Sequence, residues 1–391
     1  EGVSVTAGRL DDSPLGHLVA ETELSVAVLE RPLARDAGRW SFSSLKEKVR
    51  VISQMADQSA SHDRQGELRT DPTIENSDDR GAGDEVSTDR PFPATRPAPV
   101  GAASDESDSR WSGPTLFEGL GAGADFGTMV HELYEVVDFT DPDPEEAFRS
   151  ALHEGSRFVV TPEQQDRLPE ALTQTLLTPL GTAFGNIRLA DLSERDRLNE
   201  LDFYIPIAPA GVLPAARIGK IVGEHLQSEH PLRSWAERLK SGLSHVDLTG
   251  YMSGAIDLIF RYEVAGQERY SVLDYKTNQL GSPPSQNVGD YHPDRLVAAM
   301  EHHEYVLQAL IYSVALHRYL RLRLPGYSPA THLGPVAYLF LRGMVGAETP
   351  VASSGHWVGS PAGVFTWSVP PTLVEALSDA FDRELEYEVV R

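Results

Sequence analysis

Two acids in neighbouring strand-like segments, Asp257 and Asp274, could bind one cation between them. The segments 251–262 and 269–277 have the composition of strands, and the short connection at Ala265-Gly266 suits a hairpin turn. An antiparallel register centred on that turn places Asp257 opposite Asp274. Opposed Cβ atoms in such a pair lie about 4.5 to 5.5 Å apart, so we expect the two carboxylates to face each other across one ladder.

Lys276 adds an amine to this pair of acids. It shares a strand face with Asp274, because side chains alternate along a strand and Tyr275 points the other way. Two carboxylates so close together repel each other unless a cation lies between them, so the pattern predicts a divalent metal site. A metal that polarises a phosphoryl oxygen, beside a lysine that orients water, indicates phosphodiester hydrolysis. The alternative is an ordinary surface salt bridge, which the apolar neighbours of both acids disfavour.

The composition of the whole chain restricts the ligands of such a site. The 391 residues contain no Cys, which excludes disulfides and thiolate metal sites and favours hard cations such as Mg²⁺. The net charge of -24 is unusual for a nucleic-acid binder, although binding depends on the local field rather than on the global charge. No apolar run approaches the roughly 18 residues of a membrane span, and a cytoplasmic location is expected. The chain begins at Glu1 rather than Met, which is typical of a fragment or a processed product.

Composition also divides the chain into three parts. Residues 1–54 hold too few apolar residues to fold alone, and residues 55–113 are rich in Asp, Ser, Gly, Arg and Pro, which predicts a disordered linker. Residues 114–391 have the periodicity of an α/β domain. Its expected elements are helices near 127–138, from 144 and from 162, a strand at 200–207, helices across 214–240, the hairpin, a long helix at 293–323, a strand at 336–341 and a helix from 371.

Several motifs in this third part match a known family. Gly254-Ala-Ile-Asp257 followed by Leu273-Asp-Tyr-Lys-Thr-Asn278 resembles the core of the PD-(D/E)XK nucleases, specifically the RecB and AddA nuclease domains. Three further segments resemble the family's motifs in the family's order: Gly127-Thr-Met-Val-His131, Asn199-Glu-Leu-Asp-Phe-Tyr204 and Gln308-Ala-Leu-Ile-Tyr312. The resemblance covers nearly all of 114–391, and it implies that residues 1–54 are a remnant of the helicase region, joined to the nuclease domain by the linker at 55–113. It implies a restriction-endonuclease-like α/β fold, with a central mixed sheet flanked by helices.

The resemblance also implies roles for individual residues. His131, Asp257 and Asp274 would bind the metal through their side chains. Tyr275 would bind it through its backbone carbonyl, and Lys276 would assist the attacking water. Without the motif, His131 would be interpreted as a helix histidine that pairs with a glutamate one turn further on.

Other residues have roles that the sequence leaves open. Gln308 and Tyr312 share a helix face and could brace the metal site or touch the DNA backbone, with packing against the sheet as an equal alternative. By resemblance, Glu200 is an acid in or near the metal site, although a strand glutamate is often only exposed. The basic candidates for DNA contacts are Arg318, Arg321 and Arg342.

We therefore expect a nuclease domain that depends on Mg²⁺, with Mn²⁺ or Ca²⁺ as substitutes. By resemblance it is of the exodeoxyribonuclease V type and hydrolyses single-stranded DNA that a motor unwinds from duplex ends, in double-strand-break repair and DNA degradation. The sequence has no Gly-x-x-x-x-Gly-Lys-Ser/Thr loop, so the motor is not in this chain. The implied partners are DNA and RecC-like and RecD-like subunits, without a membrane.

Two alternatives are considered. A catalytically silent module with a nuclease fold, used for DNA guidance or subunit docking, would be expected to have lost its ligands. A stand-alone exonuclease of the iron-sulfur type would need Cys ligands, which this sequence lacks.

Overall fold

The computed structural model describes residues 39–41, 108–154, 158–209, 212–242, 247–281 and 286–382. The predicted helicase remnant at 1–54 and the linker at 55–113 lie almost wholly outside these residues. Among the helices described, none has the length and apolar character needed to cross a membrane.

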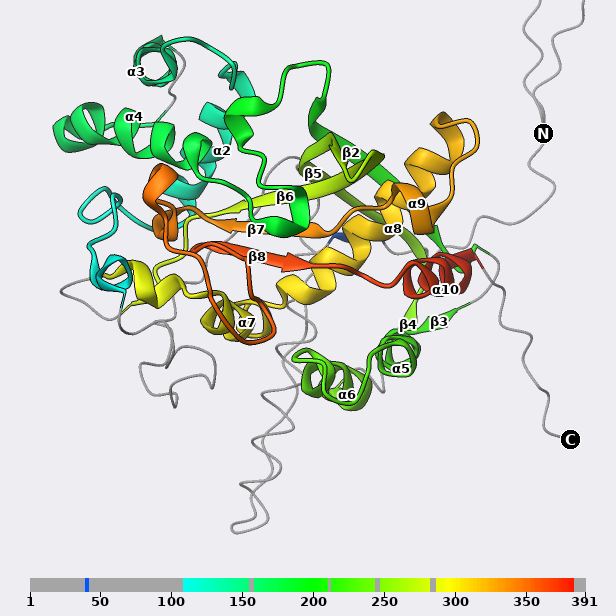
Figure 1. The fold of residues 1–391 in the computed structure, drawn as a ribbon. Helices are drawn as coiled ribbons and strands as arrows, with labels where there is room; N and C mark the ends of the chain where they lie inside the picture. Colours follow the sequence, from blue (N-terminus) through cyan, green and yellow to red (C-terminus); the bar gives the residue numbers. More distant parts are fainter. Residues whose placement is uncertain are drawn as a thin grey trace, which may run out of the picture. The chain divides into compact units, whose positions relative to one another are not determined.

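A mixed six-stranded sheet forms the centre of the described chain (Figure 1). Its strands are β1 (Arg39–Ser41), β2 (Arg197–Ile207), β5 (Gly250–Val264), β6 (Gln267–Lys276), β7 (Val336–Phe340) and β8 (Val364–Trp367). One side of β5 pairs with β2, and its other side pairs first with β1 and then with β6. The sheet continues through the parallel pair β6–β7 to the antiparallel strand β8. The predicted mixed sheet is confirmed, but β1 and β8 were not expected from the sequence.

The hairpin between β5 and β6 has the predicted register. Its turn residues Ala265 and Gly266 both have positive φ, 52° and 74°, as a two-residue turn of type I′ requires. Val264 pairs with Gln267 next to the turn, and the ladder continues in the same register to Leu258 and Leu273. Turn chemistry therefore fixes which residues of the two strands can meet.

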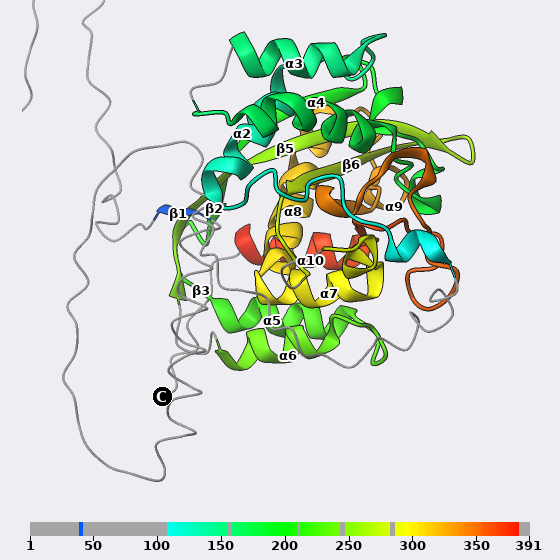
Figure 2. The same cartoon turned by 90° about the vertical axis from the view of Figure 1, so that its left-hand side faces the viewer.

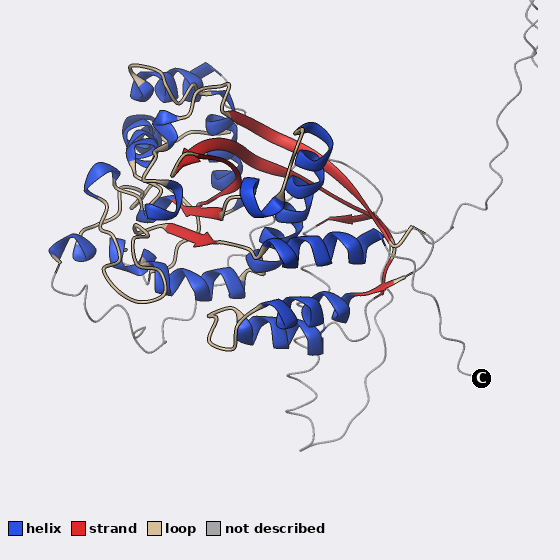
Figure 3. Cartoon of the chain, turned by 45° about the vertical axis from the view of Figure 1, so that its right-hand side comes forward, coloured by secondary structure: helices blue, strands red, loops and turns tan. Residues whose placement is uncertain are grey.

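Helices cover both faces of this sheet (Figure 2, Figure 3). The helices are α2 (Ala124–Val136), α3 (Pro144–Glu154), α4 (Pro162–Leu177), α5 (Ala215–His225), α6 (Arg233–Gly242), α7 (Pro293–His302), α8 (Tyr305–Arg323), α9 (Pro329–His332) and α10 (Pro371–Asp382). Helices α2, α3 and α4 share one hydrophobic core with the sheet, and α5 to α8 and α10 share the other. The α5–α6 pair and the small ribbon of β3 (Leu213–Pro214) and β4 (Asp247–Leu248) lie between β2 and β5 in the sequence.

The prediction of one long helix at 293–323 is wrong in one respect, because this segment forms two helices. Helix α7 ends at His302 and α8 begins at Tyr305. Between them Glu304 has a left-handed backbone with φ 57°. Its carboxylate accepts a hydrogen bond of 2.9 Å from the indole N–H of Trp235 in α6. This hydrogen bond from α6, which is distant in the sequence, stabilises the break between α7 and α8. No Gly or Pro lies at the break that would have indicated it in the sequence.

Arg342 connects the segment before α2 to the end of β6 by hydrogen bonds. Its side chain is fully buried, and Nε donates to the carbonyl of Thr277 at 2.7 Å, directly after β6. Its Nη1 donates to the carbonyl of Phe117 at 3.0 Å, and Nη2 donates to that of Gly121. Arg342, one of the residues expected to touch DNA, is therefore enclosed in the fold.

We predict that Arg342→Lys lowers the free energy of unfolding by about 2 to 4 kcal/mol, because an ammonium lacks the planar fork that reaches three separated carbonyls and leaves buried acceptors unpaired. Urea denaturation followed by tryptophan fluorescence measures this change. The matched control is Arg321→Lys on the exposed end of α8, for which a change within about 0.5 kcal/mol is expected. Equal denaturation midpoints for the two variants would contradict the role of Arg342.

Candidate metal centre

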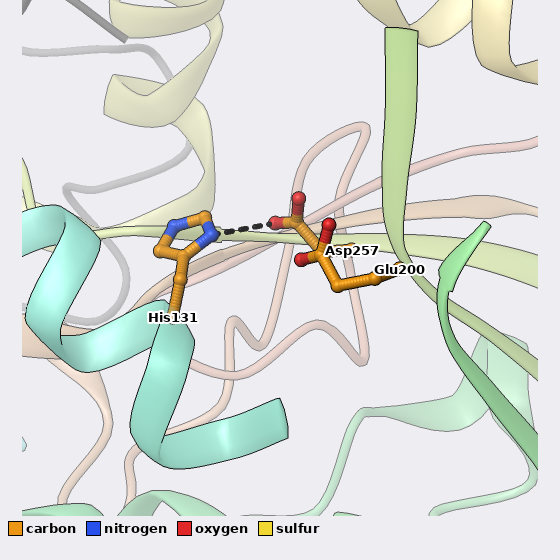
Figure 4. Close-up of side chains that lie close together, drawn as sticks. All are labelled: His131, Glu200 and Asp257. Carbon is orange, nitrogen blue, oxygen red and sulfur yellow. Dashed lines mark ion pairs between the residues drawn. The ribbon is translucent and has the colours of Figure 1, made fainter. Parts of the chain in front are cut away.

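Three side chains from three different elements meet beside the end of β6. His131 comes from α2, Glu200 from β2 and Asp257 from β5, and one potential ligand atom of each lies within 4.8 Å of the others. Figure 4 shows the imidazole pointing toward the two carboxylates, with His131 Nδ1 3.4 Å from Asp257 Oδ2. The other imidazole nitrogen, Nε2, lies 2.9 Å from the carbonyl oxygen of Tyr275. The structure therefore brings together three predicted side chains and the predicted carbonyl.

Asp257 occupies an interruption in strand pairing. On one side of β5, the pairing with β1 ends at Ser253 and the pairing with β6 begins at Leu258. Asp257 falls between these ladders, and its Oδ2 accepts a hydrogen bond of 2.9 Å from the backbone N–H of Tyr275. The expected ladder pair of Asp257 with Asp274 does not form. The predicted register is correct, but the ladder ends one residue before the two acids.

Glu200 lies opposite Asp257 in the register of β2 and β5, and its backbone is strained. Its φ of 47° is rare for a residue other than glycine and costs on the order of 1 to 3 kcal/mol. The regular pairing is interrupted here, between Asn199 with Leu258 and Leu201 with Ile256. Partial desolvation raises the pKa of the Glu200 carboxyl above its ordinary value; nearby carboxylates add to the rise and His131 opposes it. Strain of this kind is found most often at functional sites.

Asp274 and Lys276 form a buried ion pair. Lys276 Nζ lies 2.7 Å from Asp274 Oδ2, and each side chain is 1% exposed. Burying two charges costs several kcal/mol per ion, so such a pair contributes little to stability by itself. Asp274 thus meets Lys276, as their shared strand face predicts; it is not among the three grouped ligands, although its charge acts on Glu200.

Gln308 and Tyr312 lie inside the fold. Both side chains are buried, and Gln308 Nε2 donates to the Tyr312 hydroxyl at 2.9 Å. The hydroxyl of Tyr338 donates to Gln308 Oε1 at 3.2 Å. Tyr312 meets the ring of Phe203 edge-on, and Phe203 covers Gly254, where a Cβ would lie 2.8 Å from the ring. These contacts favour bracing of the sheet over contact with DNA.

The two basic candidates on α8 lie at its C-terminal end. The guanidinium of Arg318 donates to the hydroxyl and carbonyl of Ser378 and to Asp382 on α10. The side chain of Arg321 is exposed. The structure thus gives Arg318 an intramolecular role, and Arg321 alone of the three candidates is an exposed cation.

Tyr305 and Tyr338 are neighbours of the site that sequence reasoning missed. Lys276 Nζ lies 4.2 Å from the ring centroid of Tyr305 and 5.8 Å from that of Tyr338. Tyr305 stands at the start of α8 and Tyr338 in β7, far from Lys276 in the sequence. Tyr338 begins a segment that resembles RecB, but the sequence assigns no role to either tyrosine, so the tertiary fold identifies them as neighbours of Lys276.

The donor set of the cluster fits a hard divalent cation. Two carboxylates, an imidazole and a backbone carbonyl are ligands that Mg²⁺ and Mn²⁺ accept, and thiolates are absent from the chain. The backbone N–H of Tyr275 holds the Asp257 carboxylate, and the carbonyl of the same residue faces His131. The cluster could therefore hold a metal ion.

Comparisons with known proteins identify relatives for much of this chain. No protein-family model matches it. The RecBCD enzyme subunit RecB of Mycobacterium tuberculosis H37Rv is 43% identical over 275 residues, which cover 68% of this chain and 24% of that protein. The RecB subunit of Mycolicibacterium smegmatis is 41% identical over 279 residues (69% and 25%), and that of Escherichia coli K12 is 36% identical over 222 residues (57% and 17%).

The chain spans about a quarter of the length of the mycobacterial relatives. A matched stretch that covers 68% of this chain must include its central part, wherever the stretch begins. His131, Glu200 and Asp257 all lie in that central part. The cluster is therefore within the homologous region.

We predict that the chain binds Mn²⁺ and that Asp257→Asn or Glu200→Gln weakens this binding at least about tenfold, because the charge of the ligands sets the affinity of such sites. Isothermal titration calorimetry measures the dissociation constant. The matched control is Asp202→Asn, which removes an exposed acid two residues from Glu200 in the same strand. An equal loss in the control and in Asp257→Asn would contradict a specific site, as would a parent protein that binds no Mn²⁺.

Proposed function

Since this chain is homologous to RecB over 68% of its length, we propose that it is the metal-dependent nuclease domain of a RecB-type helicase-nuclease. Its proposed reaction is the hydrolysis of phosphodiester bonds in single-stranded DNA, with Mg²⁺ as the physiological cation. In the complete protein, a motor would unwind broken duplex ends and deliver the strand. Assembly with RecC-like and RecD-like subunits, and action in double-strand-break repair and DNA degradation, belong to the same proposal.

One observation carries this proposal, namely the position of Tyr275. Its N–H donates to Asp257, its carbonyl faces His131, and its neighbours in the sequence are Asp274 and Lys276. A single residue thus joins the cluster that could hold a metal to the buried lysine. A surface salt bridge would need no such arrangement.

The side chains divide the chemistry between them. A divalent cation bound by His131, Glu200, Asp257 and the Tyr275 carbonyl would polarise a phosphoryl oxygen and stabilise developing negative charge. Lys276 Nζ would orient the attacking water by a hydrogen bond to its oxygen, and its positive charge would stabilise the hydroxide as the proton passes to solvent. Asp274 Oδ2, 2.7 Å from Nζ, holds that ammonium in place by an ion pair.

The alternative is a silent module with the same fold, used for DNA guidance or subunit docking. Such a module has no need for buried charges or for strained backbone beside a cluster of ligands. The buried Asp274–Lys276 pair and the positive φ of Glu200 both cost free energy, and they favour an active site.

We predict that the chain cleaves a labelled single-stranded oligonucleotide in Mg²⁺ and that EDTA abolishes the cleavage. Asp274→Ala and Lys276→Met are each expected to lower the rate at least about 100-fold, the usual contribution of a group that assists proton transfer. Gel electrophoresis of the products measures the rate. A short oligonucleotide needs no unwinding, so the motor is not required.

The matched controls for these variants remove exposed charges elsewhere, Glu375→Ala on α10 and Lys220→Met on α5. Both should cleave as the parent does. Persistent cleavage by Asp274→Ala would disprove the proposed site. A parent chain that binds Mn²⁺ but leaves the oligonucleotide intact would favour the silent module.

A further inference from the structure

We infer that Tyr305 is a positioning residue for Lys276, an inference that rests on the proposed function. Lys276 Nζ lies 4.2 Å from the centroid of the Tyr305 ring, well inside the roughly 6 Å within which a cation is attracted to an aromatic face. Both side chains are buried, Tyr305 at 5% exposure and Lys276 at 1%. The attraction is strongest where water is excluded, so the ring and the Asp274 carboxylate together fix the ammonium.

The hydroxyl of Tyr305 holds the chain just beyond Lys276. It donates to the side-chain oxygen Oδ1 of Asn278 at 3.2 Å. The backbone carbonyl of Asn278 accepts a second hydrogen bond, of 3.0 Å, from the hydroxyl of Tyr291. Tyr305 therefore touches the lysine with its ring and the following segment with its hydroxyl. These two contacts restrict the position of the lysine's head and of the backbone that carries it.

The position of Tyr305 is itself determined by its surroundings. Its ring stacks on Tyr338 at 5.8 Å and on His303 at 5.2 Å, each at an interplanar angle of 23°. It is the first residue of α8, directly after Glu304, whose left-handed backbone separates α8 from α7. The Glu304 carboxylate accepts the indole N–H of Trp235. Helix α6 thus holds the turn that presents Tyr305 to Lys276.

Simple packing is the competing explanation, and a series of substitutions separates the two. Tyr305→Phe keeps the aromatic face, whereas Tyr305→Leu keeps an apolar side chain but removes the face. We expect Tyr305→Leu to lower the single-turnover cleavage rate at saturating oligonucleotide by about 10- to 100-fold, as the loss of an orienting partner usually does. Tyr305→Phe should recover most of that rate. DNA affinity by fluorescence anisotropy and Mn²⁺ affinity by calorimetry should not change.

Tyr319→Leu provides the matched control, because Tyr319 lies on the same helix with its ring 5.8 Å from the guanidinium of Arg323. Urea denaturation of all three variants shows whether they are folded under the assay conditions. A purely structural role predicts that Tyr305→Leu, once folded, cleaves at the parent rate. That result would overturn the inference, as would equal losses in the Phe and Leu variants.

A second measurement does not depend on cleavage and separates this inference from the proposed function. Brief acetylation of the whole chain with acetic anhydride, followed by mass spectrometry, compares the labelling of Lys276 with that of exposed Lys220. Tyr305→Leu should raise the relative labelling of Lys276 severalfold, and Tyr305→Phe should leave it near the parent value. Unchanged labelling in the Leu variant would overturn the positioning role, whether or not the parent cleaves DNA.

Discussion

The backbone of Tyr275 is the constraint on which the rest of the site depends. Its N–H lies just beyond the last β5–β6 ladder pair, Leu258 with Leu273, and donates to the side-chain carboxylate of Asp257 in β5. Its ring stacks on Tyr134 of α2 at 4.3 Å, inside the core formed by α2 to α4. Since side chains alternate, this burial turns Asp274 and Lys276 to the opposite face. The same helix that stacks on the ring carries His131 to the carbonyl.

Two features of the site cost free energy, which the packing of the surrounding hydrophobic cores must offset. A buried ion pair and a glutamate with positive φ are each unfavourable, on the order of one to several kcal/mol. Two hydrophobic cores meet at this part of the sheet: Ile256 packs in the core of α8, while Leu258 packs in that of α2. Asp257 lies between these two residues, at the point where alternate residues of β5 pass from one core to the other. Packing on both faces of the sheet stabilises the strained backbone of Glu200 and the buried ion pair, which isolated strands could not maintain.

The sequence predicted the hairpin register because the turn residues and the strand period are local properties. It also predicted the start of α4, where Thr161 and Gln164 form a reciprocal cap. It could not predict the positive φ of Glu200, the break at Glu304 or the burial of Arg342. Each of these depends on contacts between segments far apart in the chain, such as Trp235 with Glu304. The acids could therefore be named from the sequence, but the interruption that separates Asp257 from Asp274 could not.

The net acidity of the chain is compatible with the proposed phosphodiester substrate. The Asp274–Lys276 pair is neutral overall and buried, so it contributes little to the field outside the fold. Glu200 and Asp257 form an acidic edge beside His131, and desolvation with neighbouring carboxylates raises the pKa of Glu200. The neighbouring carboxylates, which add to the effect of desolvation on Glu200, also favour a divalent cation and repel a bare phosphate. Under the proposed function, a phosphodiester would approach this edge favourably only after a bound cation compensates its charge.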